Sequence, residues 1–275
     1  MTKDIQPVYT ILALDHRSSL RRLMSPQSPD KVSADELIYF KKLALKTLLP
    51  YVSHVLIDPD SGLPALKTIG QYQAKVIMSI EKSGYSEREG GRLNELLNTV
   101  EELKAQGTDI VKLLIYFNHR AKPAIYQKEL ITKVSSDCKA QNLPFLLEPI
   151  SYALPHQDDF DCEQEVLDTA KDIVSLNCSI DIYKTAFPGN NNCQELTSIM
   201  GNIPWVLLSG GDDFDEYQKL LSIAVAGGAS GFAAGRALWQ DFVKYPKEEW
   251  EGFFENTVKK RLKEIVGIVE NYREL

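Results

Sequence analysis

The chain has 275 residues, of which 44% are hydrophobic and 25% are charged, a composition typical of a globular protein with a large buried core. Its formal net charge of −7, with no basic cluster to offset it, argues against nucleic acid as the main partner. No apolar run approaches the length of a membrane span, and the first residues lack an apolar signal core. We therefore expect a cytoplasmic protein that has no membrane partner.

The cysteines and histidines give no sign of a metal site. The four cysteines show no CxxC spacing, and the four histidines form no HxH or HxxxH pair. We expect free thiols rather than a disulfide framework, and neither a bound metal nor another cofactor.

Eight short runs rich in apolar and β-branched residues predict strands. Most of the runs are apolar throughout, as is typical of parallel strands that are covered on both faces. In chain order they comprise residues 9–14, 54–57, 75–80, 110–117, 144–148, 180–187, 205–208 and 231–234.

Helical spacing of apolar residues recurs between these runs. Gly107 predicts the end of one helix, and Asp212 or Asp213 predicts the N-cap of another. The predicted helices are 34–49, 92–106, 127–141, 162–175, 213–226 and, at the end of the chain, about 247–272.

The alternation of strands and helices predicts right-handed crossovers and a parallel sheet. Eight such units fit a single α/β domain over residues 1–275, a (β/α)8 TIM barrel. An open doubly wound sheet is the alternative, but no GxGxxG follows the first strand. The loop-like stretch 81–92 follows the third strand and would lie at the barrel mouth, either covering substrate or simply exposed.

Lys184 is the most informative residue of the sixth run. Alternation with a period of two places Ile180, Ile182 and Lys184 on one face. If this face is the barrel interior, burial favours the neutral amine, which can attack a carbonyl. The alternative is a lysine of an edge strand whose ammonium extends to solvent.

The C-terminal ends of barrel strands point into one shared mouth, where enzymes of this fold keep their active sites. We expect Lys112 and Lys184 to face each other there and to lower each other's pKa. The full set predicted at the mouth is Asp15, His16, Arg17, Asp58, Lys112, Glu148, Lys184, Ser209 and Arg236.

Glu148 ends a run that is otherwise apolar. Its carboxylate would either transfer protons in a reaction of the lysine amine or neutralise Lys112 and Lys184 as an ion pair. Asp15 is a second carboxylate that would orient the lysine or the substrate hydroxyls.

Glycines follow the last two strands. Ser209-Gly210-Gly211 and Gly235-Arg236 offer backbone N–H groups and a guanidinium, and barrel enzymes frequently bind phosphate at this position. We therefore predict a phosphate site there.

Seven short motifs occur in an order that resembles one family, the class I tagatose-1,6-bisphosphate aldolases and the related sulfofructosephosphate aldolases. The resemblance extends from Ile11 to about Asp241. The motifs are Leu14-Asp15-His16-Arg17, Ile57-Asp58-Pro59, Glu81-Lys82-Ser83-Gly84-Tyr85, Val111-Lys112-Leu113-Leu114, Leu147-Glu148-Pro149, Tyr183-Lys184 and Ala234-Gly235-Arg236-Ala237-Leu238-Trp239.

The resemblance implies a carbon–carbon lyase that cleaves a phosphorylated ketohexose into dihydroxyacetone phosphate and an aldehyde. The substrate would be of the tagatose 1,6-bisphosphate or the 6-deoxy-6-sulfofructose 1-phosphate type. The resemblance makes Lys184 the Schiff-base lysine and Glu148 a proton-transfer residue. It also makes Lys112 and Asp15 supporting residues, Ser209, Gly210, Gly235 and Arg236 the cradle for the phosphate next to the ketone, and Arg17 a contact for the other end.

The sequence departs from the family pattern at two places next to predicted site residues. His16 stands where these families usually carry glutamine, and Thr185-Ala186 replaces the commoner Val-Glu after the lysine. The second departure leaves two alternatives open, a phosphosugar-binding protein without turnover and a transaldolase-type barrel enzyme. The first half of the chain looks more like the tagatose branch, and the second half looks more like the sulfosugar branch. We expect the protein to bind a small phosphorylated sugar and to form a homo-oligomer.

Overall fold

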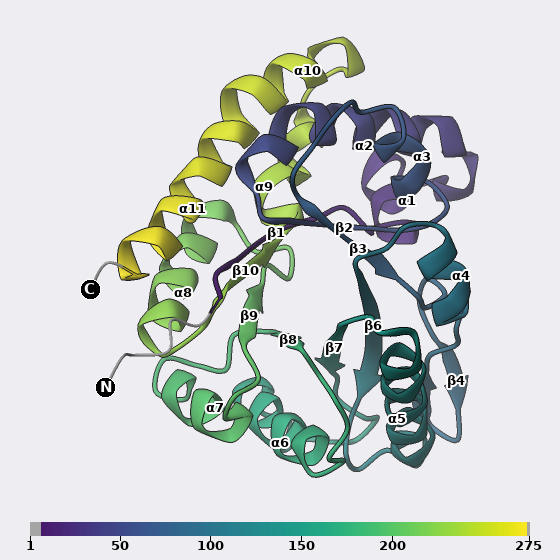
Figure 1. Cartoon of the computed structure of the whole chain (residues 1–275), viewed down its shortest axis with the longest axis vertical. Helices are drawn as coiled ribbons and strands as arrows, with labels where there is room; N and C mark the ends of the chain where they lie inside the picture. Colours follow the sequence, from purple (N-terminus) through teal and green to yellow (C-terminus); the bar gives the residue numbers. More distant parts are fainter. Residues whose placement is uncertain (1–6, 274–275) are drawn as a thin grey trace.

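The computed structural model describes residues 7–273, and within them eight parallel strands close into a barrel with helices on its outside (Figure 1). The barrel confirms the predicted fold class, and seven of the eight predicted runs contain one of its strands; the run 144–148 ends three residues before β7 does. The strands are β1 (Tyr9–Ala13), β2 (His54–Ile57), β3 (Lys75–Ser79), β6 (Ile110–Phe117), β7 (Phe145–Ser151), β8 (Ile182–Thr185), β9 (Trp205–Leu208) and β10 (Gly231–Ala234).

The first and last strands close the barrel, with Tyr9 of β1 paired to Gly231 of β10. Gly231 has a φ of +148°, and a Cβ built on it would lie 1.9 Å from the carbonyl oxygen of Tyr9. Only glycine lets the two backbones approach this closely at the closing pair.

Eleven α-helices occur among residues 7–273. Four of them match predicted helices to within two residues at each end, except that one begins at 124, three residues before its predicted start. These four are 34–48, 124–141, 162–174 and 214–226. The eleven helices are α1 (Ser18–Met24), α2 (Ala34–Leu48), α3 (Gly62–Leu66), α4 (Val100–Ala105), α5 (Ala124–Gln141), α6 (Cys162–Val174), α7 (Cys193–Met200), α8 (Phe214–Ala226), α9 (Arg236–Trp239), α10 (Trp250–Phe253) and α11 (Lys259–Arg273).

The predicted helix 92–106 is wrong over its first half. Its first two residues belong to β5 (Gly91–Leu93), which forms an antiparallel hairpin with β4 (Ser86–Arg88). Residues 94–99 are irregular, and only α4 is helical. The helix begins where the Thr99 side chain accepts from the backbone N–H of Glu102, whose side chain accepts in return from the N–H of Thr99. This capping box starts the helix at Val100, eight residues later than the leucine spacing predicts.

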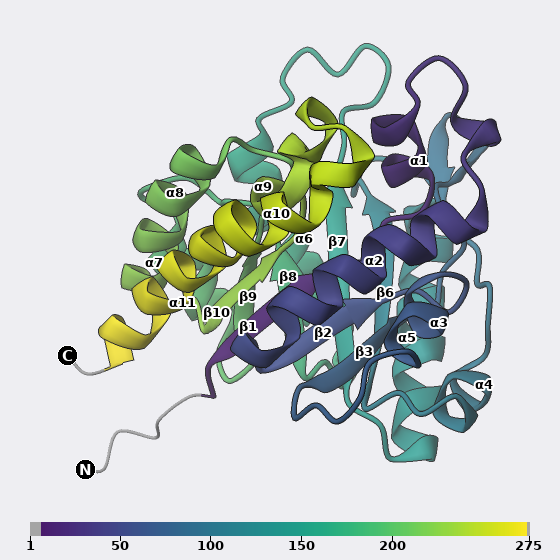
Figure 2. The same ribbon diagram turned by 90° about the horizontal axis from the view of Figure 1, so that it is seen from above.

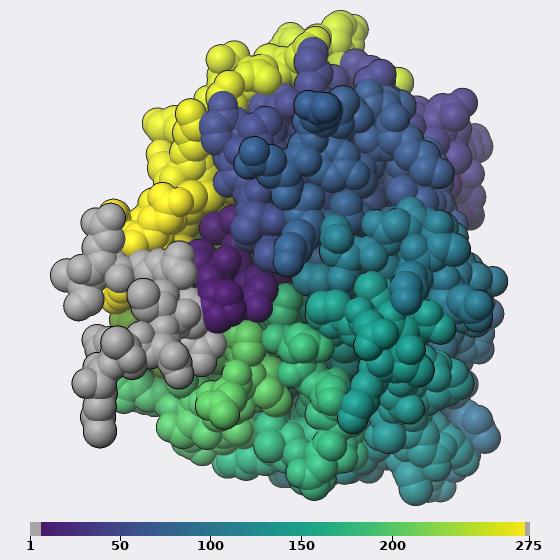
Figure 3. Space-filling view, in the orientation of Figure 1, coloured from purple at the N-terminus to yellow at the C-terminus, as the bar shows by residue number. Residues whose placement is uncertain are grey.

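The end of the chain is helical from 247 to 273, although not as one regular helix. A 3₁₀ turn (Lys247–Glu249) precedes α10, and a π-helical turn (Phe254–Val258) joins α10 to α11. This segment, yellow in the space-filling view, lies beside α2 (Figure 3). Lys46 contacts Glu251 at 2.7 Å, and Thr47 donates to Glu255 at 2.9 Å, which fixes the segment on the barrel.

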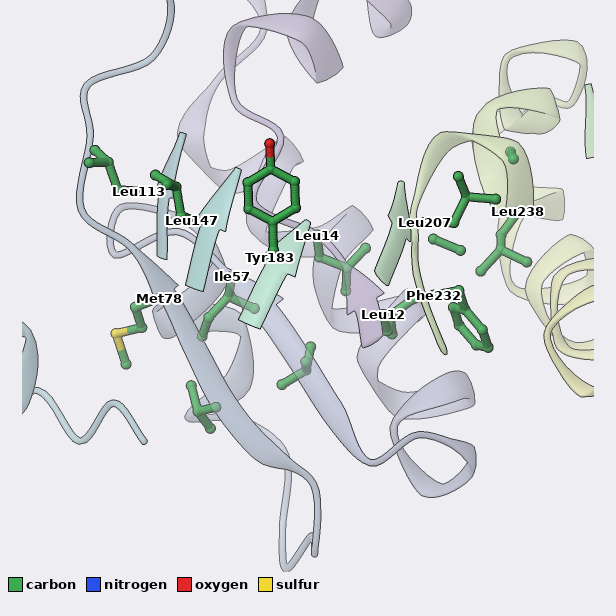
Figure 4. Close-up of a cluster of buried hydrophobic side chains, with 14 of the residues drawn as sticks. Leu12, Leu14, Ile57, Met78, Leu113, Leu147, Tyr183, Leu207, Phe232 and Leu238 are labelled. Carbon is green, nitrogen blue, oxygen red and sulfur yellow. The ribbon is translucent and has the colours of Figure 1, made fainter. Parts of the chain in front are cut away.

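Buried side chains form two layers, one inside the barrel and one between the strands and the helices. Figure 4 shows part of the outer layer, including Leu147 and Tyr183. Ile180 belongs to the outer layer, so the prediction that it shares the face of Ile182 is wrong; it precedes the strand. The inner layer consists of Ile11, Ala13, Leu56, Ile77, Ile110, Leu146, Ile182, Val206 and Ala233.

Polar residues follow this inner layer along the strands. Asp15, Lys112, Glu148 and Lys184 each come two positions after an inner-layer residue, so they point inward one step nearer the mouth. In the side view, the segment around α1 and the loop between β7 and α6 extend beyond the barrel at the end toward which β7 points (Figure 2). No helix among residues 7–273 combines the length and hydropathy needed to cross a bilayer.

Candidate active site

A cavity of about 560 Å³ lies at the C-terminal ends of the strands. It is the position at which (β/α)8 barrels keep their active sites. Of the twelve residues predicted at the mouth and in its phosphate site, ten line it, and Asp58 and Gly211 do not. The ten are Asp15, His16, Arg17, Lys112, Glu148, Lys184, Ser209, Gly210, Gly235 and Arg236.

Lys184 and Glu148 form the centre of the cavity. β7 and β8 pair through Leu147 and Tyr183, which places the next residue of each strand side by side, pointing inward. The ammonium nitrogen of Lys184 lies 2.7 Å from Oε1 of Glu148, and both side chains are buried. Lys184 is thus an interior lysine with a carboxylate in proton-transfer range, which rules out the edge-strand alternative.

Lys112 is held by three carboxylates. Its Nζ lies 2.8 Å from Asp15 Oδ2, 2.7 Å from Glu81 Oε1 and 3.0 Å from Glu148 Oε2. Burial disfavours the ammonium form, but the carboxylates outweigh burial and raise the pKa of Lys112 well above its usual value. The prediction that the two lysines lower each other's pKa is therefore wrong for Lys112, because three carboxylates surround its ammonium.

Glu81 is a site residue that the sequence reasoning did not identify. It follows β3, is buried at the cavity wall, and contacts Lys112. It belongs to the Glu81-Lys82-Ser83-Gly84-Tyr85 motif of the family resemblance, which implies no role for its carboxylate. A charged residue directly after an apolar strand was the available signal, the same one that identified Glu148.

Asp15 and His16 form the wall beside β1. Burial would raise the pKa of Asp15, but Lys112 and Lys184 outweigh it and lower that pKa far below the usual range. Burial lowers the pKa of His16 to about 3; Asp15 opposes the shift, and nearby cations add to it. His16 is therefore neutral near pH 7, and its ring contacts Trp239 edge-on with centroids 5.1 Å apart.

Asp58 does not join the mouth, contrary to the prediction. It is fully buried and forms an ion pair with Lys41 of α2. Its carboxylate also accepts from the backbone N–H groups of Ser61 at 2.8 Å and Gly62 at 3.1 Å. These partners turn the side chain away from the barrel axis, so Asp58 connects β2 to α2 and α3.

The glycines after β9 and β10 form the adjoining wall, next to the end of β1. Ser209 Oγ accepts from the N–H of Gly235 at 3.2 Å, and the Arg236 guanidinium donates to the Gly210 carbonyl. A Cβ at Gly235 would lie 2.7 Å from the Ala13 carbonyl oxygen, so this strand end requires glycine. Gly211 turns the chain with a φ of +108° and does not line the cavity.

The β3–β4 loop meets the β1–α1 loop at the rim. Arg17 donates through Nη2 to the Glu81 carbonyl oxygen at 2.6 Å, and its Nη1 lies 3.5 Å from Asp60 Oδ2. Ser83 donates to Ser18 at 2.9 Å. The first residues of the 81–92 stretch thus line the cavity, whereas β4 is exposed.

A family model described as "DeoC/LacD family aldolase" matches residues 9–241. Tagatose 1,6-diphosphate aldolase 1 of Enterococcus faecalis (strain ATCC 700802 / V583) is 29% identical over 95% of this chain and 90% of its own length. Tagatose 1,6-diphosphate aldolase 2 of the same strain is 30% identical over 86% and 80%. Among solved structures, an archaeal fructose 1,6-bisphosphate aldolase is similar with a TM-score of 0.63 and 15% identity, over 94% of both chains, which shows the shared fold.

Proposed function

The chain belongs to the DeoC/LacD family of aldolases, which makes it a carbon–carbon lyase, and we propose that it acts as a class I aldolase through a Schiff base on Lys184. The observation that carries this proposal is the buried contact of 2.7 Å between Lys184 Nζ and Glu148 Oε1. An amine and a carboxylate at this distance can exchange the protons that imine formation requires.

Proton transfer between these two groups supports the first half of the reaction. Lys184 must lose a proton to attack the ketone, and Glu148 is the adjacent acceptor. The attack forms the C–N bond of a carbinolamine. Glu148 then returns its proton to the carbinolamine hydroxyl, which leaves as water while the nitrogen lone pair forms the iminium. Lys112, held in its charged form by Asp15 and Glu81, orients Glu148 for both transfers.

The iminium supplies the electron sink for cleavage. Glu148, again a carboxylate, takes the proton of the C4 hydroxyl, and the C3–C4 bond breaks toward the iminium. An aldehyde departs and leaves an enamine on Lys184. Protonation at C3 and addition of water then release dihydroxyacetone phosphate and the free lysine.

The substrate we propose is a ketohexose phosphorylated next to its ketone. The Arg236 guanidinium and the Ser209–Gly210 turn would bind this phosphate, and Arg17 would contact the far end of the sugar. Tagatose 1,6-bisphosphate is the first candidate because the curated relatives are named for it. The sulfofructose phosphate is the second, favoured by the sequence of the C-terminal half.

Borohydride trapping tests the mechanism. Incubation with dihydroxyacetone phosphate and borohydride should place a stable adduct on Lys184, identified by peptide mass spectrometry. Lys184→Met should lose both adduct and cleavage, whereas Lys133→Met, at an exposed lysine of α5, should keep both. Active native protein without an adduct would refute the Schiff base.

A cleavage panel tests the substrate. Tagatose and fructose 1,6-bisphosphates and the sulfofructose phosphate would be compared by kcat/KM for aldehyde release. Ligand-induced stabilisation without any aldehyde would favour the non-catalytic alternative. Release that depends on an added acceptor aldehyde would favour the transaldolase type.

A further inference from the structure

Glu81 has contacts that the proposed mechanism does not yet use. Its side chain is buried in the cavity wall, with Oε1 2.7 Å from Lys112 Nζ and Oε2 accepting from the backbone N–H of Leu114 at 3.0 Å. We propose that Glu81 is a positioning residue: it fixes Lys112 and, through Lys112, holds Glu148 against Lys184. The inference rests on the proposed Schiff-base function.

The arrangement of donors explains why a carboxylate is needed. The ladder between β3 and β6 ends where Ile80 donates its N–H to the Lys112 carbonyl at 2.9 Å. Beyond this point the Leu114 N–H has no strand partner on that side and donates to Glu81 instead. Glu81 therefore meets two donors at once. A carboxylate offers two acceptors, whereas a glutamine amide offers one acceptor and would direct its NH₂ group at the other donor.

The contacts of Lys112 explain how the Glu81 carboxylate affects the position of Glu148. Lys112 donates hydrogen bonds to Asp15 and Glu81, and it forms an ion pair with Glu148, whose Oε2 lies 3.0 Å from Nζ. Glu81 and Glu148 reach Lys112 from β3 and β7, the two strands that flank β6, and Asp15 reaches it from the end of β1. Loss of one contact frees the ammonium to rotate, and Glu148 then loses a fixed partner on the side away from Lys184.

Glu81 also connects the site to the far end of the cavity. Its carbonyl oxygen accepts from Arg17 at 2.6 Å. One residue thus fixes Lys112 with its side chain and Arg17 with its main chain. A substitution of the side chain removes only the first of these contacts.

Two variants separate the length of Glu81 from its charge. Glu81→Gln keeps the length but loses the charge and one acceptor, and Glu81→Asp keeps the charge but is one methylene too short to reach both donors. Glu95→Gln is the matched control, because Glu95 follows β5 beside Lys82, the neighbour of Glu81, and forms an exposed ion pair with it. The readouts are kcat, the pH profile of kcat/KM, and the rate of borohydride trapping on Lys184.

We expect kcat and the trapping rate to fall about 10- to 100-fold in both Glu81 variants, as for a reacting group displaced by about 1 Å. In Glu81→Gln the profile should also move to lower pH by about one unit or more, because removal of a negative charge favours deprotonation of Lys112, Lys184 and the remaining carboxyls Asp15 and Glu148. His16, already neutral, would not add to the shift. In Glu81→Asp the profile should keep its position, and the control should match the native protein.

Native rates and an unshifted profile in a folded Glu81→Gln variant would overturn the inference. If that variant does not fold, a native-like kcat in Glu81→Asp would overturn it equally. Failure of the native protein to form an adduct would instead overturn the proposed Schiff base, so the two failures are distinguishable.

Discussion

Replacement of His16 by glutamine should make the fold less sensitive to acid. The imidazole lies at the cavity wall with its Nδ1 3.9 Å from Asp15 Oδ1, and its side chain is 17% exposed. Burial, assisted by the cations Arg236 and Lys184, lowers its pKa to about 3 against an ordinary value of 6.5. The folded state therefore keeps the ring neutral at pH values where the unfolded chain protonates it.

The sign and size of the effect of His16 on the unfolding free energy follow from the linkage between protonation and folding. Between pH 6.5 and 3 the unfolded state binds more protons at His16, so the stabilisation from its neutral form is present above pH 6.5 and is lost as the pH falls. The imidazole of the unfolded chain goes from about one-quarter protonated at pH 7 to almost fully protonated at pH 5, while the folded one stays almost entirely neutral. Summed over these two pH units, the difference in bound protons amounts to about 2 kcal/mol of unfolding free energy, and His16→Gln should abolish it.

Urea unfolding at pH 7 and pH 5 measures the effect. The native protein should lose about 2 kcal/mol more than His16→Gln between these two pH values. His156→Asn is the control, since His156 is exposed on a loop and asparagine tolerates its φ of 67°. Equal losses in native protein and His16→Gln, within about 0.5 kcal/mol, would show that His16 is not a buried neutral ring.

Two further changes test the fold. Asp58→Asn should destabilise the protein by about 3–5 kcal/mol, because it leaves the ammonium of Lys41 buried without a carboxylate. Recovery of stability in the double variant with Lys41→Met would confirm this cause, and a loss of stability below about 1 kcal/mol would contradict it. Gly231→Ala should lower stability by about 3 kcal/mol or more, because its Cβ would meet the Tyr9 carbonyl oxygen, whereas Gly267→Ala, with open space around it, should be tolerated. Thermal unfolding would measure both.

The local pattern of the chain was sufficient for the barrel. Parallel strands covered on both faces read as apolar runs, and the period of two already places Lys184 on the face of Ile182. The prediction of a helix over 92–106 is wrong at its start, because the leucine spacing fits a helix but does not mark where the helix begins. The start of α4 depends on the capping box of Thr99 and Glu102. That box was present in the sequence and would have corrected the boundary.

The tertiary structure alone decided the charges and contacts of the site. Lys112 keeps its proton because Asp15, 97 residues away, and Glu81, 31 residues away, reach it from other strand ends. Asp58 directly follows β2 and is predicted at the mouth together with Glu148, yet its ion pair with Lys41 of α2 keeps it out of the cavity. Strand and helix periods depend on neighbours along the chain. The state of an ionisable group depends on burial and on charges summed over space, so it is settled only when distant strands meet.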